Sequence, residues 1–132
     1  MKKVKLSTIQ NKLWKLCRLV VRSKYVKDDG TWDCFTCKQT ITKPKNAHTA
    51  HFIPSASCGV YLRFDLDNLR ICCYHCNINL GGYGAMFYRN LLEEKGKKYV
   101  DNIFKKIVVN VKVDNEYYEE KIEQYKRILE RS

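Results

Sequence analysis

The chain has 132 residues, of which 45% are hydrophobic, and a formal net charge of +11. This length fits one domain that can bury a core, and no stretch predicts a signal peptide or a membrane span. We therefore expect a cytoplasmic protein, in which paired cysteines favour a metal site over disulfides.

Residues 1–27 carry nine Lys or Arg and no acid, whereas the rest of the chain is close to balanced. This charge is compatible with two explanations of equal weight, DNA as a partner and a solvated helix face. An anionic membrane is a weaker alternative. The apolar positions Ile9, Leu13 and Val20 share one side of a helix predicted over residues 7–25, and Ser7 has the form of a capping residue. The predicted DNA contacts are Lys12, Lys15, Arg18, Arg22 and Arg63.

The remaining elements predict an α+β fold, in which a small core is flanked by N-terminal and C-terminal helices. We expect one domain over residues 1–132, with a basic helix at 1–27, the core at 31–95 and a helical region at 97–132. Strand-like runs lie at 47–53 and 60–64. Helical patterns end at Lys95, cover 99–106 and begin again near Asn115, with an extended run at 107–113 between the last two.

Two Cys-x-x-Cys pairs, Cys34/Cys37 and Cys73/Cys76, predict a structural zinc site. Each pair can present two thiolates on one side of a tight turn, and four thiolates suit a closed tetrahedral Zn²⁺. A pair formed by Cys72 and His75 has the same spacing, but thiolates are the softer ligands and are preferred. The other two cysteines, Cys17 and Cys58, have no partner at metal spacing and are expected to be small buried side chains.

Between and just after the cysteine pairs, the sequence places His51, Asn68 and Asn77 in the order typical of an HNH nuclease. A neutral histidine can activate water for phosphodiester hydrolysis, so His51 is the candidate general base. Asn68 is expected to orient the imidazole, and a helix N-terminus near Asn77 would favour phosphate. Taken singly, His51 is more simply a core or surface histidine and Asn68 an ordinary turn residue. The framing by the cysteines favours the nuclease, and with it a small zinc-stapled ββα-metal (HNH-like) core.

The same residues resemble the NinG (Rap) family of phage recombination proteins. The resemblance rests on the two cysteine pairs, on Ala50-His51-Phe52-Ile53, on the segment 62–68, and on Asn77 followed by Leu80-Gly81. It implies an HNH-like DNA endonuclease in the bacterial host cytoplasm that cuts branched intermediates such as Holliday junctions. It also implies a structural zinc, a catalytic Mg²⁺ or Mn²⁺, and His51, Asn68 and Asn77 as the motif residues.

The chain departs from this pattern around the expected catalytic metal. Many HNH enzymes place Asp or His directly before the catalytic histidine, where this chain has Ala50, and an acid expected slightly earlier is His48. His48 and Asn77 are therefore the candidate metal ligands, although a straight strand places residues 48 and 51 on opposite faces. The alternative function is a non-catalytic zinc-stabilised module that binds DNA or assists recombination. A homodimer is plausible, because junction cleavage requires two cuts.

Overall fold

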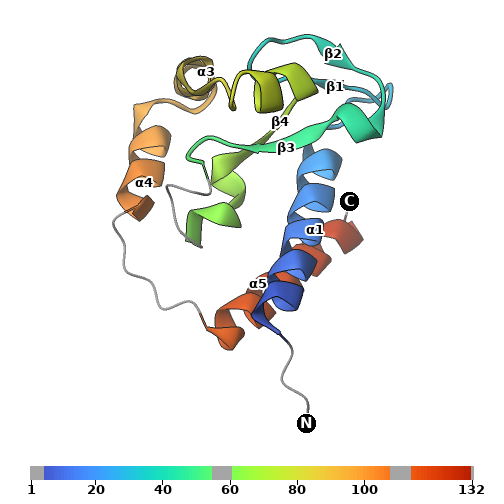
Figure 1. The fold of residues 1–132 in the computed structure, drawn as a ribbon, viewed down its shortest axis with the longest axis vertical. Helices are drawn as coiled ribbons and strands as arrows, with labels where there is room; N and C mark the ends of the chain where they lie inside the picture. Colours follow the sequence, from blue (N-terminus) through green and yellow to red (C-terminus); the bar gives the residue numbers. More distant parts are fainter. Residues whose placement is uncertain (1–4, 55–60, 108–113, 132) are drawn as a thin grey trace.

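The computed structural model describes residues 5–54, 61–107 and 114–131. In chain order the main elements are α1 (Leu6–Tyr25), β1 (Trp32–Asp33), β2 (Thr40–Ile41), β3 (His48–His51), β4 (Leu69–Cys72), α3 (Gly84–Lys95), α4 (Lys97–Ile107) and α5 (Asn115–Arg131). The predicted α+β class is confirmed, since helices predominate and two small sheets lie among them (Figure 1). Within the described ranges, none of the helices combines the length and apolar character that a membrane crossing requires.

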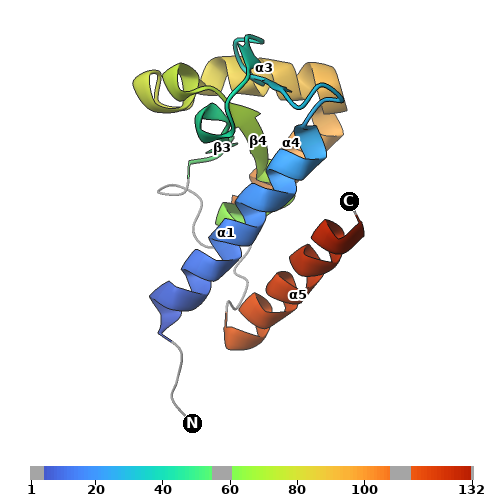
Figure 2. The same ribbon diagram turned by 90° about the vertical axis from the view of Figure 1, so that its right-hand side faces the viewer.

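The helices α1 and α5 lie side by side and run in the same direction (Figure 2). Each helix has a buried stripe: Leu13, Cys17, Val20 and Val21 on α1, and Tyr118, Ile122 and Tyr125 on α5. The predicted capping box is wrong, because α1 begins at Leu6 without a side-chain cap. The amide of Gln10 instead donates a 2.9 Å hydrogen bond to the hydroxyl of Tyr118, which ties the two helices together.

The strands β3 and β4 form an antiparallel pair in which His48 faces Cys72 and His51 faces Leu69. The prediction of a strand over 60–64 is wrong, because residues 61–63 are helical. The partner of β3 lies further along the chain, after the 3-10 turn Leu66–Asn68. The apolar pattern could not separate the two, because a buried helical turn places Leu62 and Phe64 in the core just as one face of a strand would.

The other sheet pairs β1 with β2, and the helices α3 and α4 pack against each other. Phe87 on α3 joins these parts, because its ring lies 5.0 Å from that of Phe35 and 5.6 Å from that of Phe52. The predicted helix end at Lys95 is confirmed, and Gly96 follows it with a φ of 86°. Of the predicted extended run, Ile107 ends α4 and residues 108–113 lie outside the described part of the chain.

Candidate metal centre and candidate active site

The structure brings together the four cysteines Cys34, Cys37, Cys73 and Cys76. Their sulfur atoms all lie within 4.8 Å of one another, and those of Cys37 and Cys73 are 3.8 Å apart. Tetrahedral zinc with Zn–S bonds of about 2.3 Å requires sulfur atoms about 3.8 Å apart. The cluster therefore has the ligand type, number and spacing of a structural zinc site, and it joins the turn after β1 to the turn after β4.

The surroundings of the cluster shift the pKa values of its thiols in opposite directions. Hydrogen bonding, first from Cys72, lowers the pKa of the Cys34 thiol to about 2. Burial raises the pKa of Cys37 and Cys76, so these thiols would release protons when a metal binds.

The competing ligand pair is not part of the four-sulfur group. His75 is exposed and its Nδ1 pairs with the amide of Asn79, while the thiol of Cys72 is buried beside Thr36 and hydrogen-bonds to Cys34. The buried position expected for Cys17 is found, and its thiol lies 3.8 Å from the carbonyl oxygen of Phe64. Cys58 lies outside the described residues.

The cluster also carries the turn 75–79 toward β3, where Asn77 meets His48. The Nδ2 atom of Asn77 lies 3.3 Å from Nδ1 of His48. An amide nitrogen can only donate, so Nδ1 of His48 accepts and the proton of the neutral ring is on Nε2. Both side chains line a hollow of about 240 Å³, together with Trp14, Arg18, Arg22, Lys45, Ala47 and Thr49. The two candidate metal ligands therefore lie together in a cationic hollow.

His51 lies at the other end of β3 and is fixed by two contacts. Its ring is stacked on that of Trp14, with centroids 5.0 Å apart and an angle of 11° between planes. Its Nε2 lies 3.0 Å from the carbonyl oxygen of Arg63. Because a carbonyl only accepts, Nε2 carries the proton and Nδ1 holds the lone pair. Burial lowers the pKa of His51, which favours the neutral ring.

Asn68 is completely buried and holds the backbone that surrounds His51. Its Oδ1 accepts a 2.8 Å hydrogen bond from the amide of Ile53, and its Nδ2 donates to the carbonyls of Ile53 and Leu62, both at 3.1 Å. These three hydrogen bonds go to backbone, and the orienting contact expected from this side chain is made by the Arg63 carbonyl. Asn68 thus fixes the start and the end of the connection between the two strands.

The sequence comparison agrees with the resemblance found in the central motifs. A family model described as Bacteriophage Lambda NinG protein matches residues 2–131. The chain belongs to the NinG family. This is a family of phage recombination-related proteins. Searches of curated proteins and of solved structures returned no match.

In this NinG-family chain, the predicted DNA contacts separate into different surroundings. Arg18 and Arg22 line the hollow, and Lys15 is exposed on the same helix. Lys12 borders a groove against the acidic residues Glu119 and Glu123 of α5. Arg63 is half-buried, with its guanidinium 5.1 Å from the centre of the Phe64 ring.

The sequence interpretation missed two residues of the hollow, Trp14 and Lys45. A usable signal existed for Trp14, because it shares one side of α1 with Arg18 and Arg22 at spacings of four residues. Lys45 lies in a 3-10 turn, and no residue pattern marks it.

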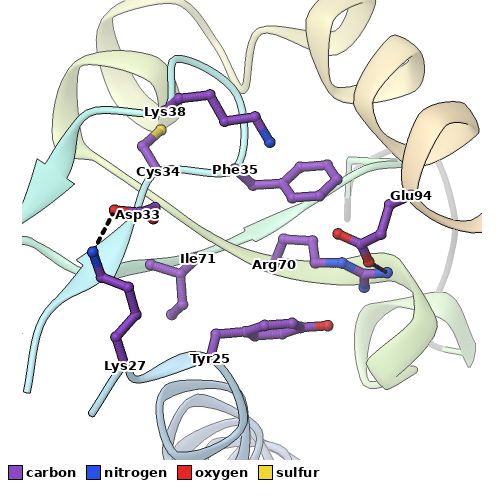
Figure 3. Close-up of a pocket in the computed structure, with 9 residues that line it drawn as sticks. All are labelled: Tyr25, Lys27, Asp33, Cys34, Phe35, Lys38, Arg70, Ile71 and Glu94. Atoms are coloured by element: carbon purple, nitrogen blue, oxygen red, sulfur yellow. Dashed lines mark hydrogen bonds and ion pairs between the residues drawn. The ribbon is translucent and has the colours of Figure 1, made fainter. Parts of the chain in front are cut away.

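A separate hollow beside the cysteine cluster contains a buried arginine that the sequence did not reveal (Figure 3). The side chain of Arg70 is 1% exposed and pairs with Glu94 at 3.2 Å. Its guanidinium lies between the rings of Tyr25 and Phe35, 5.5 and 5.4 Å from their centres. Arg70 therefore connects the end of α1, the first cysteine turn and α3, which is a packing role.

Proposed function

We propose that this NinG-family protein is a metal-dependent DNA endonuclease with an HNH-like core, acting on branched recombination intermediates such as four-way junctions. The observation that carries the proposal is the fixed, neutral imidazole of His51 next to a cationic hollow. Trp14 connects the two, because its ring both stacks on His51 and lines the hollow. The order β3, β4 and then a helical turn with Asn77 further supports an HNH-like core.

In the proposed reaction, Nδ1 of His51 takes a proton from a water molecule, whose oxygen attacks the phosphorus of a phosphodiester. The bond from phosphorus to one bridging oxygen then breaks, and that oxygen leaves as a hydroxyl after gaining a proton from solvent. Arg18, Arg22 and Lys45 supply positive charge for the phosphate. The hydroxyl of Thr49 is buried in the wall of the hollow and has no hydrogen-bond partner within the described residues.

A catalytic Mg²⁺ or Mn²⁺ would be held by Nδ1 of His48 and the amide oxygen of Asn77, after the Asn77 amide turns over and releases its hydrogen bond to that nitrogen. Such an ion neutralises charge on the phosphate and the leaving oxygen. Both ligands are neutral, and cations of this kind commonly complete their coordination with substrate phosphate oxygens. We therefore expect the ion to bind with DNA rather than before it.

The test is cleavage of labelled duplex, flap and four-way junction DNA with Mn²⁺ or Mg²⁺. We expect the parent to cut branched DNA and His51→Ala to lose at least 100-fold in rate, of the order that a general base contributes. The matched control is His75→Ala, because His75 is exposed and outside the hollow. The proposed endonuclease activity would be disproved if the parent cut none of these substrates, or if His51→Ala cut them equally well.

The charge of the hollow supports a second candidate function, a zinc-stabilised module that binds DNA without cutting it. Across the described ranges, the residues that line the hollow include three cations and no carboxylate. Ala50, which stands where many HNH enzymes have a ligand, is itself buried. Salt-sensitive DNA binding without cleavage under any divalent metal would favour this function over the endonuclease.

A further inference from the structure

Three large apolar side chains are exposed on the segment that carries Asn77. Tyr74 is 53% exposed, Ile78 52% and Leu80 44%. Single exposed apolar residues are normal on a protein surface, but a group of them next to a charged site indicates an interaction surface. We call Tyr74, Ile78 and Leu80 the apolar rim.

The apolar rim borders the candidate active site. The ring of Tyr74 meets that of His48 edge-on, with centroids 5.6 Å apart and an angle of 82° between planes. His48 in turn contacts Asn77, and both line the cationic hollow. Since Tyr74 contacts His48, a molecule that fills the hollow would also meet the apolar rim at Tyr74.

The segment of the apolar rim is held in place by backbone hydrogen bonds and by the cysteine cluster. Asn77 N donates to the carbonyl of Cys73 at 3.0 Å, and Gly82 N donates to that of Cys76 at 2.9 Å. Leu80 N also donates to the carbonyl of His75 at 2.9 Å. These bonds keep the apolar side chains from folding back into the core, where the buried Cys76 already occupies the inward side.

We propose that the apolar rim packs against unstacked bases at a DNA branch point, which makes the protein selective for branched over continuous duplex DNA. The inference rests on the proposed function, since it assigns the source of substrate choice to the same site. Arg18, Arg22 and Lys45 match the charge of the phosphate backbone. A continuous duplex shields the faces of its bases by stacking, whereas a branch point exposes base faces that apolar side chains can cover. Selection of this kind reads structure and not sequence.

The experiment uses the full chain with its zinc and no added Mg²⁺ or Mn²⁺, so that binding is measured without cleavage. The probes are a four-way junction with 2-aminopurine next to the branch point and a linear duplex with 2-aminopurine in the same sequence. We compare the parent with a Tyr74→Ala/Ile78→Ala double variant. The matched control is Ile128→Ala, which removes a 37% exposed apolar side chain from α5. Zinc content and thermal unfolding show whether the variants are folded.

We expect the parent and Ile128→Ala to raise 2-aminopurine fluorescence in the junction but not in the duplex. The double variant should lose this rise and bind the junction about tenfold more weakly, as expected for lost base stacking, with duplex binding changed less than twofold. The proposal is overturned if a folded double variant retains the rise, or if the parent binds the junction without unstacking its bases. If the parent raises the fluorescence of the junction here but cuts no DNA in the cleavage assay with Mn²⁺ or Mg²⁺, the proposed endonuclease activity is disproved and the role of the apolar rim is retained.

Discussion

Replacing Asn68 with Asp preserves the size of a buried side chain and reverses part of its hydrogen bonding. In the parent, Nδ2 of Asn68 donates to the carbonyls of Ile53 and Leu62, both at 3.1 Å. An ionised Asp would place an oxygen against these two carbonyl oxygens, whereas a protonated Asp can still donate to one of them. Burial and this repulsion should raise the pKa of Asp at position 68 far above its usual value of about 3.9.

The sign of the pH dependence follows from this raised pKa. The folded variant holds its proton when the unfolded chain has lost it, so stability falls as the pH rises. Each pH unit between the two pKa values costs about 1.4 kcal/mol, so the loss relative to the parent should grow by about 2 to 3 kcal/mol between pH 5 and pH 7.

Urea unfolding of the parent and of Asn68→Asp at pH 5, 6 and 7, with zinc present, measures this difference. The control is Asn102→Asp, because Asn102 is exposed on α4 and its replacement should change stability by less than about 0.5 kcal/mol at each pH. A loss in Asn68→Asp that is the same at pH 5 and pH 7 would refute the assigned hydrogen bonds.

Three further predictions concern the cysteine cluster, the turn after its first pair and the candidate base. Cys73→Ser should lower bound zinc below one per chain and destabilise the protein by more than about 3 kcal/mol, whereas Cys17→Ala should keep its zinc; metal analysis and thermal unfolding decide this. Lys38 has a φ of 67°, so Lys38→Gly should be about 1 kcal/mol more stable than Lys38→Ala, and equal stabilities in urea would contradict the strain. Burial lowers the pKa of His51 from 6.5, so the ring should become protonated only at a pH below 6.5. The fall of the cleavage rate at acid pH should therefore have its midpoint below pH 6.5, and a midpoint above pH 6.5 would exclude His51 as the base.

Local patterns predicted the features that depend on local spacing. The stripe on α1 and the ends of the later helices follow from apolar periodicity and from Gly96. The Cys34/Cys37 and Cys73/Cys76 turns were also readable, because two residues between thiols place both on one side of a turn.

Features set by distant parts of the chain were not readable in the same way. The second strand was expected at 60–64, but the burial of Leu62 and Phe64 makes that segment part of the core, and the strand is Leu69–Cys72. An arginine in a strand normally faces solvent, yet Arg70 is buried because Tyr25, Phe35 and Glu94 from three other segments surround it.

In the candidate active site, too, the residues could be predicted from the sequence but their contacts could not. Sequence order identified His51 and Asn77 as candidates, but only the fold shows that His51 contacts a backbone carbonyl and that Asn77 contacts His48. The cationic hollow depends on α1 lying across β3, a tertiary arrangement that residue spacing does not contain.

The pairing of α1 with α5 has a consequence for synthesis of the chain. The hydrogen bond from Gln10 to Tyr118 spans 108 residues, so the main partner of α1 is translated long after α1 itself. Until then, the buried side of α1 lacks the contacts that α5 makes with this helix in the folded protein. The basic helix α1 is therefore synthesised well before α5, which packs against it. During that interval its apolar side is exposed to chaperones and to other chains.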